Sequence, residues 1–300
     1  MLRFLRLFRL ALWRGFEHDI FTVARAAAYY SILTFFPALM VVAAVMALSH
    51  EKGFMRQVLA ALYAVLPPGS PDVVRSYLES SSGQPIGTVI SASFIMLMAS
   101  SGVVVSWMEG FTRAYQMERC WHPVKQRLIA LLLVLLASVP MGLATFSAAF
   151  GSEIEKWMMS NAAPEVGPWV VLLLWRAVRW LLSILTSIAV LALIYHLGLP
   201  RWQPWYRVMH GATLATVLWL AATEAFGWYV VNYGTYNIIY GPLGAAIALL
   251  VWLYIISIIV LIGAEFNALV YPRPQPCPEA KPANEPETKE PAAEPSAGQR

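Results

Sequence analysis

The chain has 300 residues, of which 59% are hydrophobic and only 13% are charged, and its formal net charge is +4. Soluble proteins carry about 25% charged residues, so a chain this poor in charge could not cover the surface of a soluble domain. Its two cysteines, Cys120 and Cys277, are too few for a disulfide framework. The composition therefore points to a protein whose surface faces lipid.

Residues 1–25 predict a basic and aromatic helix before the first apolar run. Its arginines fall on one side of a helical wheel: Arg3, Arg6, Arg9 and Arg14. Its large apolar residues fall on the other side: Phe4, Leu5, Phe8, Leu12 and Phe16. A helix of this kind lies on a membrane surface. Because the arginines interrupt any apolar region, the segment does not have the pattern of a cleavable signal peptide.

Six apolar segments follow, and each is long enough to cross a bilayer. Five carry no charge and have 21 to 25 residues: 26–48, 85–108, 128–152, 180–200 and 241–264. The sixth, 208–232, is interrupted only by Glu224. A hydrocarbon core of roughly 30 Å needs about 20 helical residues, and backbone polar groups in lipid must bond within the segment. Residues 26–271 therefore predict an all-α, polytopic membrane bundle of about six transmembrane helices.

Two segments outside these spans have a composition of their own. Residues 53–66 are apolar, contain Arg56 and end before two prolines, which favours either an interfacial or a re-entrant helix. Residues 272–300 hold eight prolines and nine charged residues. Such a segment cannot bury enough apolar surface to offset the entropy of ordering, so we expect a disordered, Pro-rich tail.

Lysines and arginines are distributed unequally among the predicted loops. Five lie within residues 1–25 and four between the second and third spans, whereas residues 233–240 have none. Cytoplasmic loops are enriched in these residues. Both termini are therefore expected in the cytoplasm of a bacterial cell, with the chain in the inner membrane. Arg176 and Arg179, at the edge of an outer loop, count against this bias if they are exposed.

Five short motifs resemble those of one family of membrane proteins. They are 26-AAAYYSILTFFP-37, 100-SSG-102, 239-IYGPLGA-245, 251-VWLY-254 and 261-LIGAEFN-267. Their order and spacing, over roughly residues 10–271, make the chain similar to the YihY/BrkB family (UPF0761), formerly labelled ribonuclease BN. The family-motif residues singled out are Pro37, Gly102, Tyr240, Gly241, Gly244 and Gly263. The resemblance implies about six spans in the bacterial inner membrane and an envelope role, including lipid-related transport.

Charged residues inside the spans are the candidate functional positions. Glu224 and Arg179 occupy separate spans at a similar expected depth, and Arg176 lies one turn from Arg179. Glu265 and Arg25 lie at the cytoplasmic ends of the last and first spans. Charges in a span are costly and usually pair or face water, so we expect an intramembrane polar site and a cytoplasmic-side ion pair. Each is either part of an ion or substrate path or a structural contact.

Prolines and histidines complete the set of notable span residues. Pro37 and Pro140 lie inside spans, where a proline removes a backbone hydrogen bond and can kink the helix. His196 and His210 flank the loop between the fourth and fifth spans and are expected at the membrane interface.

Catalytic chemistry is not indicated by the sequence. A nuclease needs a metal-binding carboxylate cluster or histidines near a phosphate site, but the chain has two aspartates and five scattered histidines. No nucleophile and base are paired and no metal-ligand spacing occurs. We therefore expect no enzyme activity, no cofactor, no metal site and no nucleic-acid partner.

Two functions stay open at this point. The first is transport or handling of a lipid or another amphiphile, whose anionic head group would suit the arginines in the spans. The second is a structural or scaffolding role without a transport path. Membrane lipids are partners in either case. A water-accessible cavity reaching Arg179 and Glu224 would favour transport, and a dry, fully packed bundle would favour the scaffold.

Overall fold

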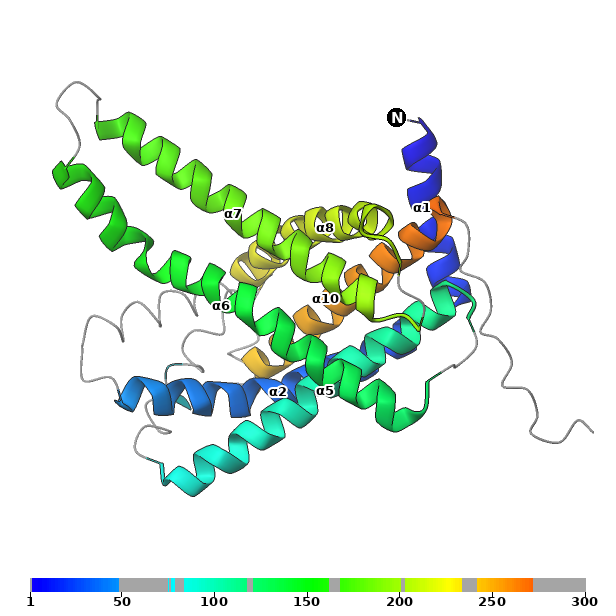
Figure 1. The fold of residues 1–300 in the computed structure, drawn as a ribbon, viewed down its shortest axis with the longest axis horizontal. Coiled ribbons are helices and arrows are strands. Elements are labelled where there is room, and N and C mark those ends of the chain that lie inside the picture. The colour runs from blue at the N-terminus through cyan, green and yellow to red at the C-terminus, as the bar shows by residue number, and fades with distance from the viewer. Residues whose placement is uncertain are drawn as a thin grey trace, which may run out of the picture.

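The computed structural model describes residues 2–48, 75, 77–78, 84–117, 121–161, 168–200, 203–233 and 242–271. Within these ranges the chain forms seven α-helices and no strand (Figure 1). In chain order they are α1 Leu2–Glu17, α2 Ile20–Leu48, α5 Ile86–Ala114, α6 Pro123–Asn161, α7 Pro168–Leu197, α8 Trp205–Tyr233 and α10 Pro242–Val270. The helix predicted at 53–66, the motif residues Tyr240 and Gly241, and the tail 272–300 lie outside the described residues.

The six helices after α1 have the length of membrane spans. They contain 29 to 39 residues, which is about 43 Å or more at 1.5 Å per residue. Five of them, α2, α5, α6, α7 and α10, also contain stretches apolar enough to cross a membrane. Helix α8 has 29 residues but no such stretch among its described residues, and it carries Arg207, His210 and Glu224. The predicted all-α, polytopic membrane bundle is confirmed.

The helices pack around α10. Helix α10 contacts α1, α2, α5 and α8, whereas α7 contacts α6 and α8. Every residue from 259 to 268 on α10 is buried. Figure 1 shows α1 crossing one end of the bundle, next to the end of α10. We call this the α1 end; α2 and α8 begin there, and α5, α7 and α10 finish there.

Helices α8 and α10 approach closely where glycines face each other. A Cβ atom on Gly263 would lie 2.9 Å from the Ala215 Cβ and would overlap the hydroxyl of Tyr195. A Cβ atom on Gly211 would overlap the carbonyl oxygen of Gly263. Small residues at a helix crossing let two backbones come together in a membrane. This explains why a glycine, the motif residue Gly263, occupies this position of α10.

Helix α1 packs one face on the bundle and turns directly into α2. Ala11 is fully buried, and the rings of Phe4 and Phe266 lie 5.5 Å apart. Asp19, in the turn after α1, has a left-handed φ of 54°, and its carboxylate accepts a hydrogen bond from the Thr22 hydroxyl at 2.9 Å. Helix α2 then begins at Ile20, so it starts inside the segment that the sequence placed before the first span.

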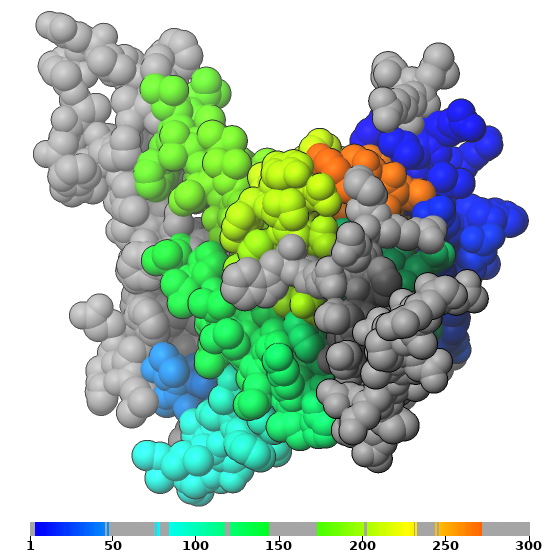
Figure 2. Space-filling model, turned by 45° about the vertical axis from the view of Figure 1, so that its right-hand side comes forward, coloured from blue at the N-terminus to red at the C-terminus, as the bar shows by residue number. Residues whose placement is uncertain are grey.

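Helices α6 and α7 leave the bundle at their far ends. We call residues 141–161 of α6 and 168–187 of α7 the α6–α7 arm, which diverges from the other helices in Figure 1. In Figure 2 the bright green part of α7, which follows its grey first residues, is separated from α8 and α10. Large apolar side chains of the arm are exposed: Leu143, Leu173, Leu174, Val178 and Leu181. In a bilayer this apolar surface can face lipid without cost.

Candidate functional site

A buried acid on α10 is paired with a histidine from the turn after α1. Glu265 is completely buried, and His18 Nδ1 lies 2.6 Å from its Oε1 atom. On the other side of the ring, His18 Nε2 lies 3.4 Å from the side-chain nitrogen of Gln116, at the end of α5. The second oxygen of Glu265 has no hydrogen-bond partner in the described chain. Since a buried charge is tolerated only when it is paired, His18 is what allows an acid at this position.

The ion pair expected between Arg25 and Glu265 does not form. Arg25 is exposed on α2 and donates from Nη2 to the Thr22 hydroxyl at 2.8 Å and from Nε to the Phe21 carbonyl at 3.3 Å. The two residues share the α1 end of the bundle, as the sequence predicted, but Arg25 faces outward. The tight turn at 18–19 brings His18 to the acid instead.

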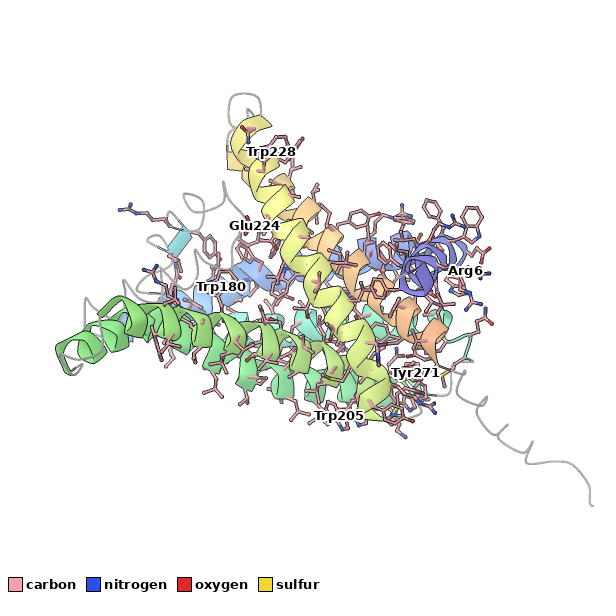
Figure 3. The ribbon with its side chains drawn as sticks, turned by 90° about the horizontal axis from the view of Figure 1, so that it is seen from above. Arg6, Trp180, Trp205, Glu224, Trp228 and Tyr271 are labelled. Atoms are coloured by element: carbon pink, nitrogen blue, oxygen red, sulfur yellow. The ribbon has the colours of Figure 1, made fainter. Side chains whose placement is uncertain are left out.

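The pair expected between Arg179 and Glu224 does not form either. No ion pair joins them in the part of the chain that the structure describes. Glu224 is exposed on α8 (Figure 3), while Arg176 and Arg179 lie on the arm, where α7 has left the bundle. Two residues at equal depth in a membrane share a level, but they can point in different directions around the bundle axis. Here the axes of α7 and α8 also diverge.

The family-motif residues that the structure describes serve helix packing. A Cβ atom on Gly102 would lie 2.8 Å from Cγ of the Tyr30 ring, so α2 and α5 meet closely there. Gly244 is buried near the start of α10, and Pro37 lies inside α2. Together with Gly263, these residues shape how the helices fit.

Side chains that link helices gather at the α1 end. Asn267 accepts a hydrogen bond from the Gly211 amide at 2.7 Å and donates to the Val208 carbonyl at 3.2 Å. The Tyr195 hydroxyl of α7 donates to the Val260 carbonyl of α10 at 2.7 Å. All are buried polar groups with partners, so α7, α8 and α10 are joined by specific bonds as well as by apolar packing.

An apolar groove runs along the same end, between α1, α8 and α10. Its volume is about 1050 Å³. Phe4, Phe8, Leu214, Val217 and Phe266 are among the large apolar side chains on its walls, and His210 and Thr213 are its polar lining residues. The groove is therefore apolar along most of its length and polar at His210, two turns into α8.

Aromatic and basic side chains surround the polar end of this groove. Arg207 lies over two rings, with Cζ 5.7 Å from the centre of Tyr206 and 5.5 Å from the centre of Tyr271. Its Nε donates to the Tyr206 hydroxyl at 3.2 Å. His210 Nδ1 lies 3.2 Å from the Tyr271 hydroxyl. We call these four residues the Arg207 cluster; Figure 3 shows Tyr271 at the end of α10, beside the start of α8.

The positive charge of Arg207 reaches into the bundle. Tyr115, just beyond the end of α5, is buried, and this burial raises the pKa of its phenol well above the ordinary value. The guanidinium of Arg207 partly offsets that rise. The described chain places no carboxylate in an ion pair with Arg207, so its charge is not cancelled locally.

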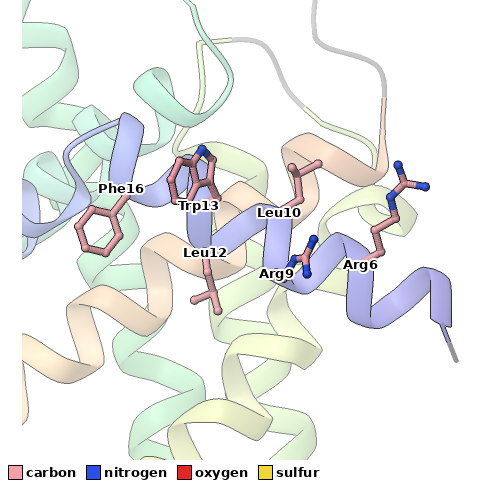
Figure 4. A pocket seen from close by; sticks show the side chains of 6 residues that line it. All are labelled: Arg6, Arg9, Leu10, Leu12, Trp13 and Phe16. Carbon is pink, nitrogen blue, oxygen red and sulfur yellow. The ribbon is translucent and has the colours of Figure 1, made fainter.

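The outward face of α1 is a second surface, and it has mixed apolar and basic character. Figure 4 shows the side chains that border it, from Arg6 and Arg9 to Trp13 and Phe16. Trp13 is 66% exposed and Phe16 is 70% exposed. Large apolar residues this exposed, next to arginines, are typical of a helix that lies at a membrane interface.

Comparison with known proteins places the chain in a family. The sequence pattern of the family described as virulence factor BrkB matches residues 12–288. The chain belongs to this family. It is 27% identical over 251 residues to the ribonuclease-like protein YfkH of Bacillus subtilis (strain 168), covering 82% of this chain and 88% of that protein. A UPF0761 membrane protein of Tolumonas auensis is 29% identical over 269 residues, covering 88% of this chain and 85% of the relative.

The family predicted from the five motifs is therefore confirmed, and the chain is a membrane protein. No solved structure matches it. Sequence reasoning missed His18, Gln116 and Asn267, whose partners are distant in the chain. It also passed over Arg207, although Tyr206, Arg207 and His210 at the start of one helix are a readable signal: a basic and aromatic turn at a span's end.

Proposed function

We propose that this protein holds a lipid or another amphiphile in the groove between α1, α8 and α10, and that it handles this molecule without covalent chemistry. The proposal rests on the groove, because its apolar walls lead to a polar, basic end. Sites that enclose small molecules have volumes of about 300–1000 Å³, and the groove has about 1050 Å³. An acyl chain suits its walls, and a head group suits its polar end.

The groove also has the right place for a molecule taken from a bilayer. It lies beside α1, whose exposed Trp13 and Phe16 suit a membrane interface. With the orientation expected from the lysines and arginines, α1 lies on the cytoplasmic face of a bacterial inner membrane. The occupant then comes from the inner leaflet and enters from the side.

A scaffolding role without a bound amphiphile is the alternative, and the crossing of α8 and α10 favours it. Gly211 and Gly263 meet there without space between them, and Asn267 bonds across the contact. This part of the bundle offers no path through its centre. Handling at a lateral groove is compatible with that packing, whereas passage between α8 and α10 is not.

Lipid retention distinguishes these functions. We expect the full chain, purified in mild detergent, to retain a bound lipid in native mass spectrometry. Val217→Trp fills the groove wall and should abolish that retained species. Val178→Trp is the matched control, because Val217 is 57% exposed and Val178, on the arm, is 54% exposed. Equal lipid retention by the two variants would contradict the proposal and favour the scaffold.

A further inference from the structure

We infer that the amphiphile in the groove is an anionic phospholipid whose phosphate is bound by Arg207 and His210. The inference rests on the proposed function and adds the chemical class of the head group. It comes from the Arg207 cluster. None of the span charges that the sequence singled out belongs to this cluster. Three features of this cluster support it: unused hydrogen-bond donors, uncancelled charge and position relative to the groove.

The guanidinium of Arg207 is held in place but keeps donors free. It lies over the rings of Tyr206 and Tyr271, and only its Nε donates within the described chain. An arginine has five N–H donors in a planar fork that matches a phosphate. The two rings and the Nε bond restrain the guanidinium, while its terminal Nη atoms donate no hydrogen bond within the described chain.

His210 supplies a second group on the same side of α8. It follows Arg207 by three residues, so the two side chains are neighbours on the helix surface. Its Nδ1 faces the Tyr271 hydroxyl and the Tyr206 carbonyl, each at 3.2 Å. This leaves Nε2 directed elsewhere, and His210 itself lines the groove. A phosphate at the groove's end can therefore contact both residues.

The charges around the groove favour an anion over a neutral head group. Glu265, the nearby acid of α10, is buried and already paired with His18. Helix α1, which forms one wall, contributes Arg6 and Arg9 on its other faces. Helix α8 begins at Trp205, so the positive end of its dipole adds to the potential at Arg207. Basic groups at a membrane surface select anionic lipids.

The test compares two lipids with identical acyl chains, phosphatidylglycerol and phosphatidylcholine, titrated onto the full chain in detergent and followed by native mass spectrometry. We expect phosphatidylglycerol to bind at least about fivefold more tightly than phosphatidylcholine, which is the difference that one added cationic contact gives. Arg207→Gln should reduce its affinity to that of phosphatidylcholine. His210→Gln should cause a smaller loss. Arg179→Gln, on the arm, should change neither lipid and serves as the charge control.

The outcomes separate this inference from the proposed function. If both lipids bind with equal affinity and Arg207→Gln changes nothing, the groove holds an amphiphile but the head-group assignment is wrong. If neither lipid binds, both fail. Val217→Trp should weaken both lipids equally, because it acts on the acyl chain. If inorganic phosphate competes as well as phosphatidylglycerol at equal concentration, the ligand is a free phosphate and the lipid assignment is overturned.

Arg207→Lys is the control for a loss of lipid binding that is caused by misfolding. It keeps the charge and removes the planar fork, so phosphatidylglycerol affinity should fall between those of the wild type and Arg207→Gln. Thermal unfolding in detergent should be unchanged in both variants, since Arg207 is partly exposed at the start of α8. Unchanged phosphatidylglycerol affinity in a folded Arg207→Gln variant would overturn the inference.

Discussion

The α1 end of the bundle and the α6–α7 arm place their polar residues in opposite surroundings. At the α1 end, Glu265, Asn267 and Tyr195 are buried, and each bonds to a residue of another helix or turn. On the arm, the guanidinium of Arg179 is partly exposed, and the acid expected to pair with it, Glu224, is exposed on α8. One region is held by specific contacts, and the other is placed mainly by its apolar surface.

The difference follows from how closely the helices approach. Glycines at 211 and 263 let α8 and α10 come together, and a polar side chain buried at such a contact must find a partner. The arm diverges from α8 in Figure 1, and Arg179 forms no ion pair with Glu224 in the described part of the chain. A charge within a span therefore identifies a helix contact only where small residues accompany it. Three experiments test this contrast, beginning with the one that has the largest expected effect.

Gly263→Val should have the largest effect, because its side chain would overlap Tyr195 and Ala215 at the closest helix contact. We expect a loss of roughly 3 kcal/mol of stability or more, at the upper end for overpacking, measured as thermal unfolding in detergent. Gly142→Val on α6 is the control, since a Cβ atom there meets nothing within 4 Å. Equal losses in the two variants would show that the α8–α10 contact is not special.

His18→Ala should have the next largest effect, because it leaves Glu265 buried without its partner. Removing one member of a buried pair costs about 3–5 kcal/mol. Glu265→Gln in the same background should restore part of that loss, which a double-mutant cycle on unfolding measures. Arg25→Ala should change stability by less than about 0.5 kcal/mol, as for an ordinary surface substitution. If Arg25→Ala proved as costly as His18→Ala, Arg25 would be the acid's partner after all.

Arg179→Gln and Glu224→Gln should show no coupling to each other. The structure forms no ion pair between them, and residues that do not meet usually give additive effects within about 0.3–0.5 kcal/mol. The same unfolding cycle used for His18 and Glu265 provides the comparison. A coupling as large as that of the buried pair would mean that the arm closes on α8 and that the two regions are alike.

Much of the fold could be predicted from the sequence, because most of the predicted spans are uninterrupted apolar runs. Even the segment containing Glu224 was recognised, although α8 is the one of the six long helices whose described residues include no stretch apolar enough by itself to cross a membrane. The spans set the level of each charge along the bundle axis, which is why Glu265 was correctly expected at the same end as Arg25. Which residue faces the acid depends on the direction around that axis, and residues 18 and 265 are 247 positions apart.

The groove could not be predicted for a similar reason. Its walls come from α1, α8 and α10, which are distant in the chain, and each wall residue has the character of an ordinary lipid-facing or core side chain. Arg207 directly precedes the apolar segment 208–232, so in the sequence it has the character of an ordinary loop charge. Its contact with both Tyr206 and Tyr271 requires the end of α10 to lie beside the start of α8, and no local sequence pattern indicates that.

A structure of the protein in a bilayer disc containing phosphatidylglycerol tests the central claim most directly. The account predicts elongated density in the groove between α1, α8 and α10, running along Val217 and Phe266 and ending in a head group against Arg207 and His210. Well-ordered lipid density confined to the α6–α7 arm, with the groove filled only by protein side chains, would contradict it.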